Sequence, residues 1–561
     1  MSQRVAVYDT TLRDGTQGAG ISFSADDKLR IARRLDALGV DYVEGGWPGS
    51  NPKDLTFFAR ARDLRWEHCK VTAFGSTRRP RIGPEEDANL QVLLQAATPA
   101  VALFGKSWDL HVATALRTDL EENLRMIAES VAYLKRHGVE VIYDAEHFFD
   151  GYRHNSAYAL ATLRAAKDAG ADILVLCDTN GGMLPGEIRA VVAVVLREVG
   201  GAVGIHAHND GELAVANSLA AIEAGAAHVQ GTINGYGERC GNANLCSIVP
   251  NLILKTGRVC LRPAALAELT EVSRFVSEMA NLAPNEYQPF VGRNAFAHKG
   301  GVHVSAVMAD PVTYEHIEPA AVGNRRRVVV SDLSGRANVL YKAAEVGIPL
   351  ERSRPETAQI LARLKQLEHE GYQFEGAEAS FELLVRRTLG THAPPFALQW
   401  FRVTVATDRD GAARAEATVK LVVDGVEEHT AADGNGPVHA LDRALRKALD
   451  RFYPELRAIR LTDYKVRVLN AEAATAARVR VLIQSSDGVR TWGTVGVSEN
   501  VVEASRIALV DSLEYGLFAR GSISTQRGDG EHVQQAAAET ADSHAGDVRR
   551  ADRPQGAAAA E

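Results

Sequence analysis

The sequence predicts an α/β fold in which a (β/α)₈ TIM barrel is followed by a helical connector subdomain and an α+β regulatory domain. Eight short apolar segments alternate with amphipathic ones, polar residues close nearly every apolar segment, and the pattern changes after about residue 390. Parallel strands need crossover connections, which are usually helices, so this alternation over about 240 residues favours a closed barrel.

The eight apolar segments are rich in Val, Ile and Leu and have the length of buried strands. They span residues 4–11, 41–46, 70–76, 100–107, 139–146, 171–179, 202–210 and 227–234. Helical periodicity separates them, as in residues 25–38, where Leu29, Ala32, Leu35 and Leu38 recur at helical spacing. An open doubly wound sheet is the alternative, but no G-x-G-x-x-G turn follows the first segment, which disfavours a dinucleotide-binding sheet.

Polar residues stand at the end of these segments. They are Asp9 and Asp14, Glu44, Ser76, Lys106, Asp144 and Glu146, Asp178 and Thr179, His206 and His208, and Asn234. In a TIM barrel, the carboxyl ends of the strands and the loops that follow them build the active site. Any one of these polar residues could stand at a strand end simply because that end is exposed to water. The same pattern at all eight segments is harder to explain in this way.

A metal site is predicted from residues far apart in the sequence. His206 and His208 lie two apart, so both imidazoles point to one face of a strand, although H-x-H alone is a weak signal. Closure of the barrel brings strands seven, eight and one together, so Asp14 and Asn242 can join the two histidines. Mixed oxygen and nitrogen ligands favour Mg²⁺ or Mn²⁺, with Zn²⁺ as an alternative.

Two other interpretations concern the same region. A metal-dependent hydrolase of another barrel group also uses H-x-H, but typically at its first strand, where this chain has Arg13 and Asp14. Asp9 is interpreted as a structural residue that braces the TTLRDG loop through backbone amides.

Composition excludes several classes of partner. The 561-residue chain has a formal net charge of −8, which disfavours general binding to nucleic acid or to an anionic membrane. The first residues show no signal-peptide pattern, and no segment approaches the ~20 apolar residues of a membrane helix. The five cysteines form no C-x-x-C pair and fit reduced thiols. We therefore expect a cytoplasmic protein.

Three motifs carry a resemblance to a known family. YDTTLRDGTQ, HAHND and GYGERCGNANL resemble the signatures of the DRE-TIM metallolyases, specifically the 2-isopropylmalate, homocitrate and citramalate synthases, and the resemblance runs from Val5 to about Gly521. It implies a Claisen-type condensation, in which an acyltransferase joins acetyl-CoA to a 2-oxo acid. The implied metal ligands are Asp14, His206, His208 and Asn242.

The resemblance also implies roles in the pocket. Arg13 would hold the 2-oxo acid and stabilise enolate charge, a task that suits an always-protonated guanidinium; a structural salt bridge is its alternative. Substrate contacts are expected from Asp144, Glu146 and Thr179, with Glu146 also in the catalytic set, and Glu44 and Glu238 would brace the site. No motif for binding CoA is visible.

Two segments indicate the 2-oxo acid. EGGWPGSNPKD (44–54) and CDTNGGMLP (177–185) resemble the longer citramalate synthases, whereas 2-isopropylmalate synthases usually have phenylalanine at the position of Trp47 and DTVGY at that of DTNGG. An indole can close the pocket around the methyl group of pyruvate, or it can serve only in packing. Pyruvate is therefore the expected substrate, on a route to isoleucine. Isopropylmalate synthesis is the alternative, and a C–C lyase is the alternative of another class.

The remaining domains follow residues 1–280, which are assigned to the barrel. Residues 281–390 are predicted to form the connector, which in the family covers a barrel mouth, often that of the partner subunit. There His303 would assist deprotonation of the acetyl methyl group and Tyr314 would contact substrate. A structural histidine is the alternative for His303.

Residues 391–521 show strands followed by a helix, twice over, without clustered catalytic residues; two strands, FRVTVAT and ATVKLVVDG, are predicted before the first of these helices. The resemblance implies an allosteric dimerisation domain that binds the end-product amino acid, so we expect a homodimer with isoleucine as effector. Residues 522–561 are polar and rich in alanine, which predicts a disordered tail.

Overall fold

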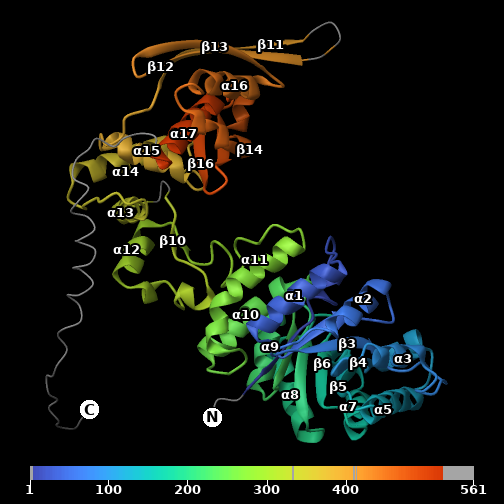
Figure 1. Ribbon diagram of the computed structural model, residues 1–561. Helices are drawn as coiled ribbons and strands as arrows, with labels where there is room; N and C mark the ends of the chain where they lie inside the picture. Colours follow the sequence, from blue (N-terminus) through green and yellow to red (C-terminus); the bar gives the residue numbers. More distant parts are fainter. Residues whose placement is uncertain (1–3, 331–333, 408–410, 412, 522–561) are drawn as a thin grey trace, which may run out of the picture. The chain divides into compact units, whose positions relative to one another are not determined.

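The computed structural model of the chain describes residues 4–330, 334–407, 411 and 413–521 (Figure 1). The predicted tail at 522–561 lies outside these residues. Two compact units are present: the first comprises residues 1–298 and 306–327, and the second comprises residues 299–305 and 328–561. No helix in the described part of the chain combines the length and apolar composition needed to cross a membrane.

The first unit contains a closed barrel of eight strands in sequential order. They are β1 (Ala6–Asp9), β2 (Tyr42–Gly46), β3 (Lys70–Ser76), β4 (Ala100–Lys106), β5 (Glu140–Glu146), β6 (Ile173–Asp178), β7 (Ala202–Ala207) and β8 (His228–Gly231). Closure is direct, because β1 pairs in parallel with β8 and Ala6 lies opposite His228. The predicted TIM barrel is confirmed, and the open sheet is excluded.

Side chains fill the inside of the barrel. Tyr8, Tyr42, Phe74, Ile142 and Val175 belong to one buried cluster of inward-facing residues. Every residue of β2 and of β6 is buried, as expected for strands that are covered on both faces. The inside of the barrel is therefore a packed core, and space for a substrate is expected only at the ends of the strands.

Helices surround the strands, as Figure 1 shows. They are α1 (Ala25–Leu38), α2 (Pro52–Ala61), α3 (Ala88–Gln95), α4 (Asp109–His111), α5 (Leu120–Arg136), α6 (Phe148–His154), α7 (Ser156–Asp168), α8 (Pro185–Glu198), α9 (Ala214–Glu223), α10 (Leu245–Pro250) and α11 (Leu269–Met279). The first begins with a capping box between Ser24 and Asp27 and ends at Gly39, whose φ of 90° only glycine adopts easily.

Between the barrel and residue 388, most of the regular elements are helices, joined by long irregular segments. Its elements are β9 (Ala297–His298), α12 (Gly301–Ala309), β10 (Arg327–Val328), α13 (Arg336–Glu345), α14 (Pro355–His369) and α15 (Glu378–Thr388). Val339, Ile360 and Phe381, from the last three helices, share a buried cluster with Val495 near the C-terminus. These helices therefore contribute to the core of the second unit.

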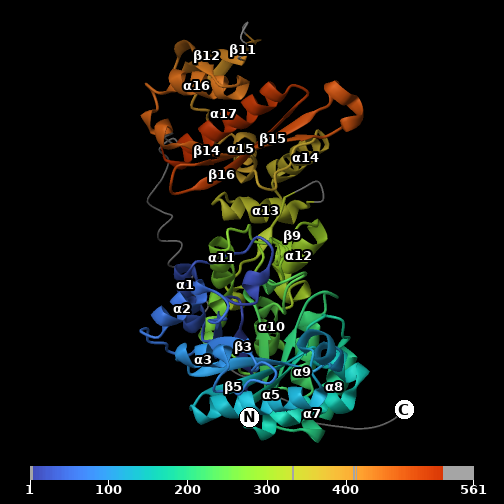
Figure 2. The ribbon, with the colours of Figure 1, turned by 90° about the vertical axis from the view of Figure 1, so that its right-hand side faces the viewer.

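The C-terminal region contains two antiparallel three-stranded sheets, each followed by a helix (Figure 2). The first set is β11 (Ala397–Thr407), β12 (Ala413–Val423), β13 (Val426–Gly434) and α16 (Pro437–Leu449); the second is β14 (Arg460–Val468), β15 (Val479–Ser486), β16 (Thr491–Ser498) and α17 (Val501–Ala519). The predicted repeat is present, but its first half holds three strands rather than two.

The strand that the prediction missed is β13. Its sequence, VEEHTAADG, has only one large aliphatic residue, so it gives no signal of apolar alternation. It forms because a tight turn after Val423 returns the chain along β12, with Val423 paired to Val426. Pairing with the neighbouring strand therefore accounts for the formation of β13, and the intrinsic β propensity of its residues does not.

Candidate active site

A cavity of about 410 Å³ lies among the carboxyl ends of the barrel strands. It is lined by Arg13, Asp14, Thr16, Gln17, Trp47, Ser50, Asn51, Asp54, Phe74, Phe104, Asp144, Glu146, Cys177, Thr179, His206, His208, Glu238 and Arg239. Seven of the residues that the sequence nominated for binding or catalysis are therefore brought into one pocket. Glu238 is a further nominated residue that lines it.

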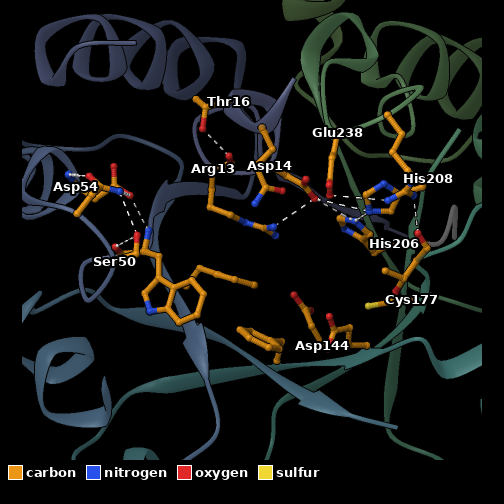
Figure 3. Close-up of a pocket in the computed structure, with 18 residues that line it drawn as sticks. Arg13, Asp14, Thr16, Ser50, Asp54, Asp144, Cys177, His206, His208 and Glu238 are labelled. Carbon is orange, nitrogen blue, oxygen red and sulfur yellow. Dashed lines mark hydrogen bonds and ion pairs between the residues drawn. The ribbon is translucent and has the colours of Figure 1, made fainter. Parts of the chain in front are cut away.

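Asp14, His206 and His208 converge on one side of this pocket (Figure 3). The Nε2 atom of His206 lies 3.3 Å from Asp14 Oδ2 and 3.2 Å from His208 Nε2. His208 Nε2 lies 3.9 Å from the same carboxylate oxygen. Neighbouring ligand atoms of an octahedral ion with bonds of ~2.1 Å are roughly 3 Å apart, so these three atoms fit one divalent ion.

Unpaired polar atoms support the same fit. Among the described residues, Asp14 Oδ1 and Asn242 Oδ1 are buried without a hydrogen-bond partner. Asn242 does not line the cavity, but it is joined to His208 by a β-bridge, and its Nδ2 donates to Tyr236 O at 3.3 Å. A buried acceptor left unpaired costs ~1–3 kcal/mol, which a bound cation would offset.

The charge states also suit a cation. Burial alone would raise the pKa of Asp14, but Arg13 and His206 outweigh it and hold that pKa well below its usual range. Burial, together with repulsion from His206, lowers the pKa of His208 to about 3. Near neutral pH the site therefore offers a carboxylate and the neutral imidazole of His208, the forms that bind metals. For His206, burial lowers the pKa but its contacts with Asp14 outweigh burial and raise it, so a metal ion would compete with a proton there.

Arg13 is held from several sides. Its Nε donates to Glu44 Oε2 at 2.7 Å, Nη1 lies 3.3 Å from Asp14 Oδ2, and the guanidinium carbon lies 3.8 Å from the centre of the Phe74 ring. The buried Glu44 also accepts from the Tyr8 hydroxyl at 2.6 Å. The salt-bridge and substrate-binding interpretations of Arg13 are therefore compatible. The salt bridges position the guanidinium but use only some of its five hydrogen-bond donors.

Three further polar residues lie on the strands opposite Arg13 or just after them. Burial, with Glu44 nearby, raises the pKa of Asp144 to about 7. Glu146 forms an ion pair with Lys106, a contact that the sequence did not reveal. Thr179 Oγ1 accepts a hydrogen bond from the amide of His147 at 2.9 Å, which fixes the hydroxyl at the pocket edge.

An aromatic wall, formed by Trp47, Phe74 and Phe104, closes another side. The indole meets Phe74 and Phe104 edge-on, at centroid distances of 5.8 and 5.6 Å, and the two phenylalanines stack at 5.2 Å. Trp47 Nε1 donates to Asn89 Oδ1 at 2.8 Å, so the indole is anchored at its polar end. Sequence reasoning missed both phenylalanines, although each precedes a strand end, in KVTAFGS and AVALFGKS.

Comparison with known proteins assigns each part of the chain. Residues 4–276 match the HMGL-like family, residues 290–372 the homocitrate synthase post-HMGL domain-like family, and residues 375–517 the LeuA allosteric (dimerisation) domain. The (R)-citramalate synthase of Geobacter sulfurreducens is 56% identical, covering 92% of this chain and 98% of its own, and that of Aquifex aeolicus is 57% identical with the same coverage.

The chain belongs to the (R)-citramalate synthase family. The 2-isopropylmalate synthase of Methanocaldococcus jannaschii covers the same 92% of this chain, and 95% of its own, at only 31% identity. The prediction that this is a condensing transferase of the citramalate branch is therefore confirmed. The LeuA match begins before α15, in agreement with the packing of that helix in the second unit.

Three other residues that the sequence singled out, Asp9, His303 and Tyr314, do not line the cavity. Asp9 accepts from the amide and hydroxyl of Thr11, both at 2.9 Å, as the bracing interpretation predicts. Tyr314 follows a 3₁₀ turn at Pro311–Thr313 in the first unit, is exposed and does not line the cavity. His303 lies on α12 and belongs to the second unit, so its role stays a prediction.

Proposed function

We propose that this protein condenses acetyl-CoA with pyruvate and hydrolyses the resulting thioester, giving (R)-citramalate and CoA. The observation that carries the proposal is a single pocket that combines a divalent-metal ligand set, an anchored arginine and an aromatic wall. The family membership supports the reaction type, and the small, partly aromatic pocket supports a small 2-oxo acid.

Asp14, His206 and His208, with Asn242 Oδ1, are proposed to hold Mg²⁺ or Mn²⁺, with Zn²⁺ as the alternative. A bound divalent ion supplies Lewis-acid polarisation of a ketone. Arg13 stands beside this set, so it can grip the carboxylate of the 2-oxo acid and stabilise negative charge on the reacting oxygens. Thr179 and Asp144 bound the same space from the opposite strands.

Proton removal from the acetyl methyl group is proposed for His303 acting with Glu146. The methyl carbon then forms a bond to the ketone carbon of pyruvate, whose oxygen takes up a proton, and water cleaves the thioester to release the CoA thiol. Glu146 is supported by its place in the pocket and by Lys106, which orients its carboxylate. His303 and Tyr314 are supported only by the family resemblance of their segment.

The test is release of free CoA thiol from acetyl-CoA across a panel of 2-oxo acids. We expect the highest kcat/KM with pyruvate and a lower value with 2-oxoisovalerate, because each extra carbon changes binding in an apolar pocket by ~10–200-fold. A preference for 2-oxoisovalerate would instead assign isopropylmalate synthesis. Thiol release with none of the 2-oxo acids would contradict the condensation and favour a lyase.

Feedback by isoleucine on a homodimer is proposed for the C-terminal region. We expect isoleucine, but not leucine, to lower kcat/KM for pyruvate about 5–150-fold, the usual range of allosteric coupling. Kinetics and calorimetry with each amino acid, and light scattering for the dimer, provide the measurement. Equal inhibition by leucine, or no binding of isoleucine, would contradict the assignment.

These measurements require the whole chain. Ser380 donates to Asp511 at 2.8 Å, and Arg387 pairs at 2.9 Å with both Asp511 and Glu514, so α15 is tied to α17. A truncation near Leu389 would cut through this network and expose the core that it covers. Loss of regulation in such a fragment would therefore not isolate the effector site.

A further inference from the structure

Gln230 connects two parts of the site that lie on different strands. From β8, its Oε1 lies 2.8 Å from Nδ1 of His206 on β7, and its Nε2 lies 3.0 Å from Oδ1 of Asp144 on β5. All three side chains are buried: the exposed fractions are 0% for Gln230, 5% for His206 and 4% for Asp144. Gln230 has no place in the condensation described above, and it does not line the pocket.

The orientation of the amide follows from its partners. When Asp144 is ionised, its carboxylate oxygen can only accept a hydrogen bond, so the end of Gln230 that faces it is the NH₂ group. The opposite end is then the carbonyl oxygen, which can only accept, and His206 Nδ1 must carry a hydrogen to donate to it. In the neutral imidazole, the lone pair then belongs to Nε2.

That lone pair faces the proposed metal site. His206 Nε2 is the atom that lies 3.3 Å from Asp14 Oδ2 and 3.2 Å from His208 Nε2. The two histidines differ in this support, because His208 Nδ1 is buried with no hydrogen-bond partner among the described residues. The orientation of His206 thus depends on a specific buried amide, whereas the described residues provide no equivalent for His208.

We infer that Gln230 is a positioning residue that holds His206 in the tautomer and ring orientation required for metal binding, and that Asp144 in turn orients Gln230. The inference rests on the proposed metal site. Partners of this kind raise the affinity of a site without touching the ion, and their loss commonly weakens metal binding ~10–100-fold.

The alternative is that Gln230 only fills space in the barrel. Three variants of the full-length chain separate the two possibilities. Gln230→Met keeps a similar volume and shape without the amide. Gln230→Glu, when protonated, still offers a carbonyl acceptor to His206 and a hydroxyl donor to Asp144. Ser218→Ala is the control, since it removes a buried hydroxyl of α9 that donates to Ala214 O at 2.8 Å and does not line the pocket.

The measurement is titration of metal-stripped protein with Mn²⁺, followed by electron paramagnetic resonance without substrate, and by circular dichroism for the fold. We expect Gln230→Met to raise the Kd for Mn²⁺ ~10–100-fold. Gln230→Glu and Ser218→Ala should stay within a few-fold of the unmodified chain.

Unchanged Mn²⁺ affinity in folded Gln230→Met would overturn the inference while leaving the metal site intact. If Gln230→Met does not fold, Gln230→Glu still tests the inference. A tenfold loss of Mn²⁺ affinity in folded Gln230→Glu would contradict the proposed hydrogen bonds. Failure of the unmodified chain to bind Mn²⁺ would overturn the proposed metal site itself, and the inference with it.

Discussion

Replacing Asp14 or His208 with alanine is expected to lower kcat by roughly 10³-fold or more, because Lewis-acid catalysis supplies several kcal/mol to the reaction barrier. Each residue contributes one of the three atoms that converge in the pocket. In the Asp14→Ala variant, Arg13 loses its ion pair with Asp14 but keeps its 2.7 Å hydrogen bond to Glu44, so the loss of substrate positioning should be smaller than the loss of metal-dependent turnover. The variants should therefore lose metal affinity and turnover together.

Metal removal provides the second arm of this experiment. Treatment with a chelator should abolish thiol release, and Mg²⁺ or Mn²⁺ should restore it to the unmodified chain but not to either variant. Asp26→Ala is a suitable control, because it removes an exposed carboxylate of α1 that pairs only with Arg60 in the described interactions. Undiminished turnover in the metal-free protein would rule out the metal-dependent mechanism.

Trp47→Ala is expected to shift substrate preference towards 2-oxoisovalerate. The ratio of kcat/KM for 2-oxoisovalerate to that for pyruvate should rise ~10–200-fold, because truncation opens space for the added methyl groups. The indole is well placed for such exclusion, since it meets the edges of Phe74 and Phe104 and is anchored by Asn89. Pyruvate turnover itself should fall, because a small substrate would be less closely held.

Trp66→Ala is the matched control for this substitution. Trp66 is also half-buried, and its Nε1 donates to a backbone carbonyl, Ala61 O, at 3.0 Å, but it does not line the cavity. Its loss should leave the ratio unchanged even if stability falls. Steady-state kinetics with both 2-oxo acids measures the effect, and an unchanged ratio in Trp47→Ala would establish that the indole serves only in packing.

Metal binding and substrate selection depend on different strands of the barrel. The proposed metal ligands come from β7 and from the loops after β1, β7 and β8, whereas the aromatic wall comes from β3, β4 and the loop after β2. Substitutions in the wall should therefore change specificity with little effect on Mn²⁺ affinity. This separation allows the two predictions to fail independently of each other.

The predicted metal ligands illustrate how much of the site the local sequence can locate. The H-x-H spacing predicted that His206 and His208 share a face, because side chains alternate along any strand. Asp14, some 190 residues earlier, joined them only on the assumption that eight strands close into a barrel. The pairing of β1 with β8 confirms that the eight strands close into a barrel.

Other features left no usable pattern in the sequence. Gln230 is one polar residue in a short buried strand, and nothing local shows that it lies between His206 and Asp144. Phe74 and Phe104 resemble ordinary core residues, and only the barrel brings them against Trp47. Each of these contacts joins different strands or loops, so its distance depends on barrel geometry.

The sequence by itself determined the eight-stranded barrel, the family and about half of the residues that line the pocket, because period, spacing and motifs are properties of neighbouring residues. The tertiary structure decided that Arg13 is the group braced by Glu44, that Gln230 orients His206, and that the chain after the Asp424–Gly425 turn pairs with β12 as β13. These features depend on contacts across strands, where burial strengthens a hydrogen bond and a neighbouring strand stabilises a sequence of weak β propensity.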